Sequence, residues 1–161
     1  MNPGGVRSDF TFAQSGGEGD GNVTFGEAFT VQPFNNLVVT QTFTGAQLKA
    51  VLEQQFAGQD GQVKDTILQV SNSLTYTYSA SAANGSKVSE LKLNGQPIDP
   101  ATSYKVTTND FLANGGDGFT NLTAGTDRVT APGFDVDALT ALLGAGNPVA
   151  PGPANRITKI A

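Results

Sequence analysis

The sequence predicts one α+β domain over residues 1–161, built from an α/β-type mixed sheet with flanking helices. Three observations lead to this prediction. Segments typical of strands and of helices follow one another in mixed order. Hydrophobic residues make up 38% of the chain, enough for a core, whereas only 14% are charged. No internal repeat or low-complexity tail divides the 161 residues, a length that is usual for one domain.

Loops dominate the first third of the chain. Glycine-rich turns are expected over 2–7 and 15–22, and the apolar residues of 23–34 are irregularly spaced. The β-branched and aromatic residues of 37–43 then predict a strand.

The clearest helix signal follows this strand. Thr44 is a natural N-cap, and Gln47 completes a capping box. Gly58 is a stop signal. Between them, apolar residues recur at helical spacing, so one face is expected to pack against the core: Leu48, Val51, Leu52 and Phe56.

The middle of the chain has the pattern of β-structure. Strands are expected over 67–71, 74–80, 88–93 and 104–108. The dipeptide Asn94-Gly95 is the strongest hairpin signal in the chain.

Three features are expected near the end of the chain. Asp135 caps a short helix that stops at Gly144. The Pro- and Gly-rich segment 144–153 forms a stiffened loop, and 155–160 forms a last strand.

Missing residue types exclude several kinds of chemistry. The chain has no His and no Cys, which excludes a Ser-His-Asp triad, a cysteine nucleophile and a zinc site made of imidazole or thiolate. Metals could bind only through oxygen ligands. The net charge of −5, with 9 scattered basic residues, argues against a nucleic-acid polymer as partner. No apolar run is long enough to span a membrane, and no signal-peptide pattern is visible after Met1.

Three loop segments combine glycines with polar or aromatic side chains, a pattern typical of sites built on a rigid scaffold. The first is Asn2-Pro3-Gly4-Gly5-Val6-Arg7. Its backbone N–H groups and the Arg7 guanidinium suit a phosphate. On spacing alone, a plain turn with a solvated arginine is the favoured alternative.

The second segment, residues 31–36, is a rigid Pro-Phe corner followed by two asparagines. Phe34 could stack on a flat ring, and the Asn side chains could bind a base edge. Taken alone, a phenylalanine buried under a turn is the commoner arrangement.

The third segment, residues 109–119, places Phe111 ahead of a loop with glycines at 115, 116 and 118. Such a loop lets the backbone approach a ligand closely, and Asp117 could accept two hydrogen bonds from a ribose diol. A calcium loop is the rival interpretation, although the spacing does not match an EF-hand, with these oxygen donors: Asn109, Asp110, Asn114 and Asp117.

Together and in this order, the segments resemble motifs of the 5′-nucleotidase family of two-domain metallophosphatases. The family pattern N-x-G-G-[IV]-R matches residues 2–7, and V-x-P-F matches 31–34. The pattern T-G-x-x-L-K matches 44–49, and N-x-F-L-A-x-G-G-D-G-[FY] matches 109–119. The resemblance is to the C-terminal, substrate-binding domain and covers essentially the whole chain.

The resemblance implies substrate-binding residues but no catalytic or metal-binding residue in this chain. Phe34 and Phe111 are similar to the two aromatics that sandwich the nucleobase, and Arg7 resembles the arginine that reaches the phosphate. Asp117 is similar to the carboxylate that takes the ribose hydroxyls.

Two asparagines complete the implied site. Asn2 resembles the asparagine near the base and ribose, and Asn36 is a candidate for a base-edge contact. Asn35 stands where the family usually has glycine.

The resemblance also implies what lies outside this chain. The family's two divalent metal ions and catalytic His-Asp pair belong to an N-terminal metallophosphatase domain, so Met1 is expected to be a natural or engineered boundary. We therefore expect a nucleotide- or nucleoside-recognition domain that is not catalytic alone. It would belong to a metal-dependent phosphoester hydrolase of nucleotide catabolism that is secreted, periplasmic or on the cell surface.

Two other classes of function stay open. One is a non-catalytic surface-binding or structural module with an unused pocket. The other is a self-sufficient metalloenzyme with oxygen ligands. The intact set of Phe34, Phe111, Asp117 and Arg7 argues against the unused pocket, and the sequence offers little support for the metalloenzyme.

Overall fold

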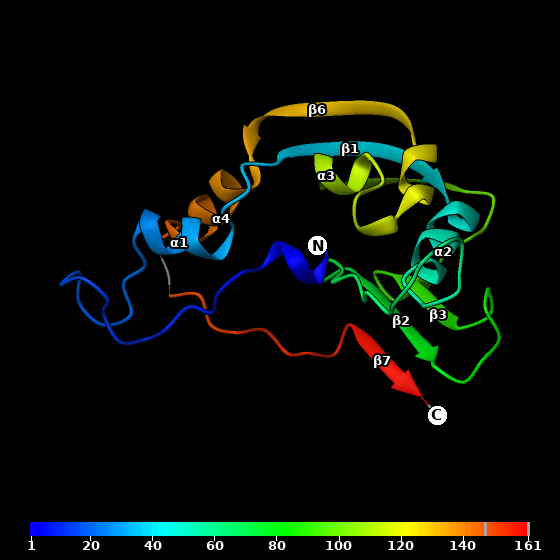
Figure 1. Cartoon of the computed structure of the whole chain (residues 1–161), viewed down its shortest axis with the longest axis horizontal. Helices are drawn as coiled ribbons and strands as arrows, with labels where there is room; N and C mark the ends of the chain where they lie inside the picture. Colours follow the sequence, from blue (N-terminus) through cyan, green and yellow to red (C-terminus); the bar gives the residue numbers. More distant parts are fainter. Residues whose placement is uncertain (147, 161) are drawn as a thin grey trace.

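The computed structural model describes residues 1–146 and 148–160. The strands of these residues form two sheets, one with the order β5-β1-β6 and one with the order β4-β3-β2-β7. Figure 1 shows β1 and β6 along one side of the molecule, β2, β3 and β7 along the other, and α2 between the two sides. The predicted α+β class with flanking helices is confirmed, but the strands are divided between two sheets.

The three-stranded sheet is antiparallel around a central strand, β1 (Leu37–Thr44), which matches the predicted strand. On one side β1 pairs with β5 (Ser103–Asn109), also predicted. On the other side it pairs with β6 (Thr126–Phe134), which the sequence pattern did not indicate. β6 is mostly exposed and contains Pro132 and Gly133, residues that are tolerated on an edge strand but hide its identity in the sequence.

The four-stranded sheet is mixed. β2 (Leu74–Ser79) and β3 (Val88–Leu93) are antiparallel, and β4 (Gln96–Pro97) follows the predicted hairpin turn. At that turn Asn94 and Gly95 both have positive φ, 51° and 78°, as a type I′ turn requires. β7 (Ile157–Ile160) lies parallel to β2.

One predicted strand is wrong. Residues 67–71 are extended in pattern but belong to neither sheet among the described residues. A strand needs a partner as well as β-branched residues. In the described structure, the backbone-to-backbone hydrogen bonds that residues 67–71 make to a distant segment are the two between Gln69 and Met1.

The helix α2 (Gly45–Glu53) connects the two sides of the molecule. The Thr44–Gln47 capping box is confirmed, but the helix ends at Glu53, ahead of Gly58. Val51 belongs to one apolar cluster and Leu52 to the other, so successive residues of one helix pack towards the two sheets. The first cluster also contains Phe43, Leu68, Leu112, Phe119 and Leu122, and the second contains Phe56, Tyr76 and Val88.

Two buried glutamines, Gln54 and Gln55, form hydrogen bonds in this interior. The Gln55 amide donates to the hydroxyl of Tyr76 at 3.0 Å, and burial raises the pKa of Tyr76 to about 12. The Gln54 amide donates to Thr120 at 2.8 Å, and its carbonyl oxygen accepts from the backbone N–H of Asn121 at 2.9 Å. The loop that follows residue 116 is therefore tied to the end of α2.

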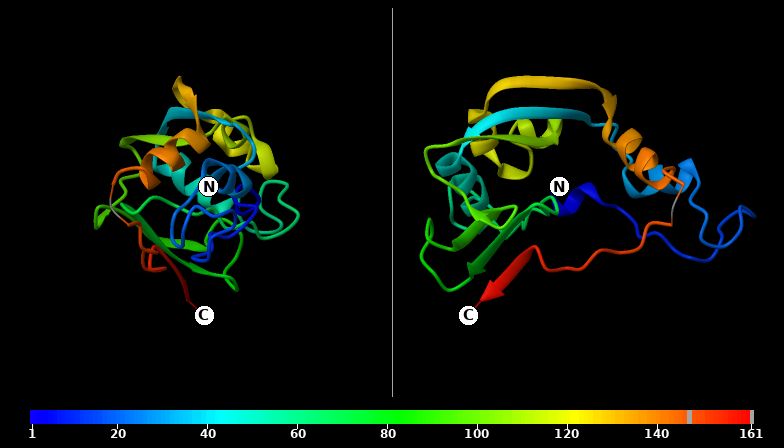
Figure 2. Two further views of the ribbon diagram at one scale, coloured as in Figure 1. Left: turned by 90° about the vertical axis from the view of Figure 1, so that its left-hand side faces the viewer. Right: turned by 180° about the vertical axis from the view of Figure 1, so that it is seen from behind.

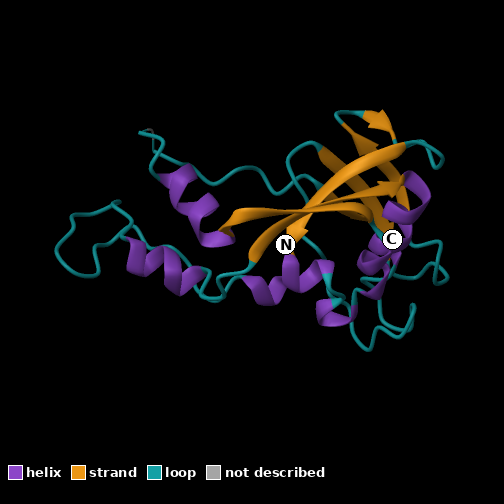
Figure 3. Ribbon diagram, turned by 90° about the horizontal axis from the view of Figure 1, so that it is seen from above, coloured by secondary structure: helices purple, strands orange, loops and turns teal. Residues whose placement is uncertain are grey.

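Two helices lie together away from the sheets, as Figures 2 and 3 show. α1 (Phe25–Val31) is a helix that the irregular apolar spacing did not indicate, although Thr24 and Glu27 form its capping box. Its Phe25 is 62% exposed, so no clean buried stripe marks the helix in the sequence.

α4 (Asp135–Leu143) is the predicted short helix, and Gly144 is its C-cap. Its N-cap is Phe134, not Asp135, and the backbone N–H of Phe134 donates to the carboxylate of Asp137 at 2.8 Å. Of the expected loop 144–153, residue 147 lies outside the described residues.

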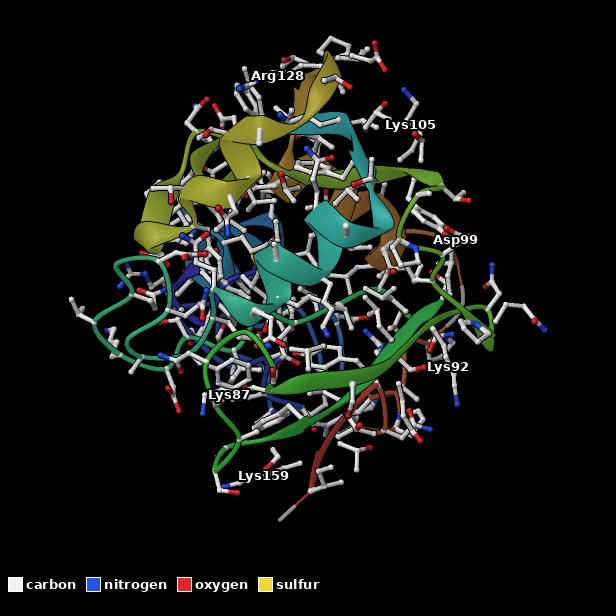
Figure 4. All side chains as sticks on the ribbon, turned by 90° about the vertical axis from the view of Figure 1, so that its right-hand side faces the viewer. Lys87, Lys92, Asp99, Lys105, Arg128 and Lys159 are labelled. Atoms are coloured by element: carbon white, nitrogen blue, oxygen red, sulfur yellow. The ribbon has the colours of Figure 1, made fainter. Side chains whose placement is uncertain are left out.

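The basic side chains are scattered. Figure 4 shows Lys87, Lys92, Lys105, Arg128 and Lys159 at the periphery of both sheets, on different strands and connections. Within the described part of the chain, no helix combines the length and apolar character needed to cross a bilayer.

Candidate functional site

The six candidate residues meet at one cavity of about 170 Å³. They come from the three loop segments that the sequence singled out, which are separated by tens of residues in the chain. The cavity is lined by Asn2, Gly4, Gly5, Arg7, Phe34, Asn36, Asn109, Phe111 and Asp117. The structure therefore brings all six candidates together.

Phe111 forms one wall of the cavity and is held by backbone. It lies on the short helix α3 (Asp110–Ala113), where the side chain of Asn109 caps the N–H of Leu112 at 2.9 Å. Leu112 is buried, while Phe111 is 44% exposed. A Cβ on Gly116 would stand 2.5 Å from the Phe111 ring, so any larger residue here would require the ring to shift. The third glycine-rich segment thus packs directly against the aromatic ring.

Phe34 forms another wall and lies against a side chain. It is 40% exposed, and the guanidinium carbon of Arg7 lies 4.9 Å from its ring centroid. This is a cation–π contact between two of the candidate segments. The backbone N–H of Arg7 also donates to the carbonyl of Val31 at 2.9 Å, so the two segments are joined by main chain as well.

Asn35 has φ of 49°, in the left-handed region. Asparagine is among the few non-glycine residues that adopt this conformation readily. Asn35 therefore keeps the backbone bend that a glycine would make at this position.

Asn36 is anchored to the start of α4. Its amide donates to the carboxylate of Asp135 at 3.0 Å, and its backbone carbonyl accepts from the N–H of Asp135 at 2.8 Å. The Asn36 side chain thus has one amide hydrogen engaged, while its carbonyl oxygen stays available to a ligand.

Asp117 and Asn2 lie side by side at the cavity. The Asn2 amide donates to Oδ2 of Asp117, and the backbone carbonyl of Asp117 accepts from Gln62 at 3.2 Å. Asp117 has φ of 53° between glycines 115 and 118, which also have positive φ. This tight turn presents an exposed carboxylate beside the nearly buried Asn2.

The amide oxygen of Asn2 is buried and has no hydrogen-bond partner among the described residues. A buried acceptor left unpaired is costly, on the order of 1–3 kcal/mol. Asn2 also lines the cavity, so this buried and unpaired group belongs to a residue of the cavity wall.

The oxygen donors of the rival calcium loop do not converge. Their hydrogen bonds run to four separate parts of the chain: Asn109 to Leu112, Asp110 to Leu37, Asn114 to Arg128, and Asp117 to Asn2. Within the described residues, no group of three or more His, Cys, Asp or Glu side chains could hold a metal ion. The donor set of this chain does not fit the pair of divalent ions that the resemblance places in the family's other domain.

Three residues that shape the site were not among the predicted nucleotide-binding residues. Asn109 lines the cavity and caps α3, and its position just before Asp110-Phe111 was the available signal. Asp135, expected to cap α4, instead holds Asn36. Gln62 supports Asp117 from a loop that carried no signal of its own.

Comparisons with known proteins show the family of this chain. The family model "5'-nucleotidase, C-terminal domain" matches residues 1–124. A "5'-nucleotidase-related protein" of Glossina morsitans morsitans is 34% identical over 148 residues, which are 87% of this chain and 26% of that protein. "Cell wall protein Lmo0130" of Listeria monocytogenes is 36% identical over 120 residues, 73% of this chain and 14% of that protein. This chain thus spans about a quarter or less of these two relatives.

A solved structure extends the likeness to the whole fold. The 5'-nucleotidase precursor from Thermus thermophilus superposes with a TM-score of 0.81 at 30% identity, covering 99% of this chain and 30% of that one. The cavity lies entirely within the residues that the family model matches. This chain belongs to the 5'-nucleotidase C-terminal domain family.

Proposed function

We propose that this chain is a nucleotide-recognition domain, and that the 170 Å³ cavity binds the nucleoside end of a nucleotide. One observation carries the proposal. Two half-exposed phenylalanines, an arginine and a carboxylate, far apart in the sequence, line the same cavity.

The base is proposed to stack between Phe34 and Phe111. Both rings line the same cavity and are exposed there, so a flat ligand could cover apolar surface on each of them. Stacking on an aromatic ring contributes roughly 1–3 kcal/mol per base and tolerates every base. Broad base specificity follows.

The sugar and the phosphate of the nucleotide would bind to the polar groups of the cavity. The Asp117 carboxylate, held by Asn2 through one oxygen, can accept hydrogen bonds from ribose hydroxyls. Arg7 presents an exposed guanidinium that suits a phosphate oxygen pair.

The cavity holds only part of such a ligand. Small-molecule sites usually enclose about 300–1,000 Å³, and this one is smaller. We propose that an N-terminal metallophosphatase domain, as in longer members of the family, completes the site. That domain would supply the two divalent ions, since no donor set in the described residues fits them, and would carry out hydrolysis.

The names of the relatives support a proposal about the cellular setting. Because they include a 5'-nucleotidase-related protein and a cell wall protein, we place this chain in nucleotide breakdown outside the cell or at its surface. The competing function is a non-catalytic binding or structural module with an unused pocket.

A titration of the purified chain with AMP, adenosine and ribose 5-phosphate, followed by NMR, tests the proposal. Because half of the site would be missing, we expect a dissociation constant of about 1 mM for AMP and adenosine. Ribose 5-phosphate, which lacks a base, should bind at least tenfold more weakly. Shifts should centre on the residues of the cavity.

Two outcomes would contradict the proposal. If AMP at about ten times this concentration moves no resonance of the cavity, the unused-pocket module is favoured. If the purified chain hydrolyses AMP, hydrolysis does not need a second domain.

A further inference from the structure

The loop of residues 57–66, which follows the end of α2, reaches the candidate site from outside the cavity. Gln62 in this loop is buried, with 6% of its surface exposed, but it is not among the residues that line the cavity. Burying an amide is costly unless the amide is hydrogen-bonded. The partners of Gln62 therefore indicate what this buried side chain does.

The Gln62 amide lies against the backbone of the third glycine-rich segment. Its Nε2 donates to the carbonyl of Asp117 at 3.2 Å. A Cβ on the next residue, Gly118, would stand 2.9 Å from Oε1 of Gln62. The amide thus contacts the chain on both sides of the peptide bond that joins Asp117 to Gly118.

The backbone of Asp117 has a conformation that needs such support. Its φ of 53° lies in the left-handed region, which non-glycine residues adopt mainly where the surrounding structure holds them. Asn2 holds the side chain of Asp117 through Oδ2, and Gln62 holds its main chain. The direction of the carboxylate therefore depends on both contacts.

Two main-chain hydrogen bonds fold the loop around Gln62. Its N–H donates to the carbonyl of Gln59 at 2.9 Å, and its carbonyl accepts from the N–H of Gly58 at 2.7 Å. The carboxylate of Asp60 also accepts from the amide of Asn121 at 3.0 Å, which joins the loop to the chain beyond the site. Figure 4 shows the loop, in blue-green, next to this yellow part of the chain. Protein contacts alone therefore hold Gln62 in place.

We propose that Gln62 is a positioning residue for ribose. By fixing the backbone of Asp117, it aims the carboxylate at two neighbouring sugar hydroxyls. This inference rests on the proposed function of the cavity and names the part of the ligand that the loop controls. Phe34, Phe111 and Arg7, proposed to bind base and phosphate, are held by other contacts. Loss of the Gln62 amide should therefore weaken ribose binding selectively.

The experiment compares two nucleosides by NMR titration of the 161-residue chain. Adenosine has both ribose hydroxyls, and 2′,3′-dideoxyadenosine has the same base and neither hydroxyl. Gln62→Met keeps the length of the side chain but removes the donor to Asp117. Gln59→Met is the matched control in the same loop, because the hydrogen bonds of Gln59 in the described structure are made by its backbone.

The unaltered chain should bind adenosine about fivefold more tightly than 2′,3′-dideoxyadenosine, the difference that one net hydrogen bond gives. In Gln62→Met, adenosine should weaken by about the same factor, and 2′,3′-dideoxyadenosine should change by less than about twofold. The preference for the ribose is then lost. Gln59→Met should keep it. Should Gln62→Met not fold, Gln62→Ala, which introduces no longer side chain, carries the same expectation.

Three results would overturn the inference. If the Gln62 variant keeps the preference, or weakens both nucleosides equally, Gln62 does not position Asp117 for ribose, while the nucleoside cavity stands. If the unaltered chain binds both nucleosides equally well, there is no ribose preference for Gln62 to set. If it binds neither nucleoside, the proposed function itself fails, and the inference fails with it.

Discussion

Phe111 and Phe34 line the same cavity and are almost equally exposed, at 44% and 40%, yet they are held in different ways. Phe111 lies on a capped helical turn against the backbone of Gly116. Phe34 lies beneath the exposed side chain of Arg7, next to the left-handed Asn35. One wall is therefore fixed by main chain, and the other depends on a charged side chain.

The difference suggests a division of roles within the proposed site. A ring held by backbone is ordered before a ligand arrives and sets the plane in which a base can stack. A ring held by Arg7 can adjust when the guanidinium engages an anion, so base and phosphate binding are coupled at that wall. Four predictions test this comparison.

Replacing each ring by alanine should have the largest effect. Loss of stacking lowers AMP affinity by about 1–3 kcal/mol, roughly 5- to 150-fold. We expect Phe111→Ala at the upper end of this range and Phe34→Ala at the lower, because the preordered ring loses less entropy on binding. NMR titration measures both, and Phe12→Ala, at an exposed ring away from the cavity, is the control. If Phe34→Ala loses more AMP affinity than Phe111→Ala, Phe34 and not Phe111 is the ring that is ordered before the ligand binds.

Gly116→Ala tests whether backbone contact fixes Phe111. Gly116 is outside the left-handed region, so its new methyl acts only through crowding against the ring, 2.5 Å away. Overpacking should cost about 1–3 kcal/mol of unfolding free energy and weaken AMP binding in parallel. Urea unfolding and titration measure the two effects. Gly26→Ala in α1, where the nearest atom is 3.9 Å away, should be neutral or slightly stabilising. If Gly116→Ala changes neither the unfolding free energy nor the AMP affinity, Phe111 is not held by this contact.

Arg7→Ala should weaken the binding of the phosphate group and leave the binding of the base nearly unchanged. AMP affinity is expected to fall by roughly fivefold to tenfold, since an exposed charge-assisted contact is screened by solvent and salt. Adenosine, which lacks the phosphate, should change by less than about twofold. Calorimetry at two salt concentrations measures both ligands, with Lys92→Ala on the other sheet as the charge control. An equal loss for adenosine would show that Arg7 acts only through Phe34.

The smallest effect concerns the corner next to Phe34. Asn35→Ala should lower the unfolding free energy by about 1 kcal/mol, because alanine resists positive φ. Asn35→Gly should change the unfolding free energy by only about a few tenths of a kcal/mol. Thermal or urea unfolding distinguishes the two variants. Equal stability of both would mean that the corner does not need its left-handed bend.

Local signals predicted much of the fold. The Thr44–Gln47 capping box and the Asn94-Gly95 turn were both predictable, because a few neighbouring residues set their geometry. β6 and α1 were not, because one is an exposed edge strand containing proline and the other has an exposed aromatic face. Residues 67–71 show the converse, since a strand-like segment joins no sheet without a partner.

For the site, the sequence by itself determined the candidate side chains and the turns that carry them, because glycine, asparagine and proline restrict the backbone locally. It also determined which chemistry is excluded, because the chain has no imidazole or thiol. Only the tertiary structure decided that Asn2 meets Asp117, that Asn36 is held by Asp135, and that both rings open into one cavity. These contacts join residues up to 115 positions apart, and their geometry depends on how α2 packs between two sheets.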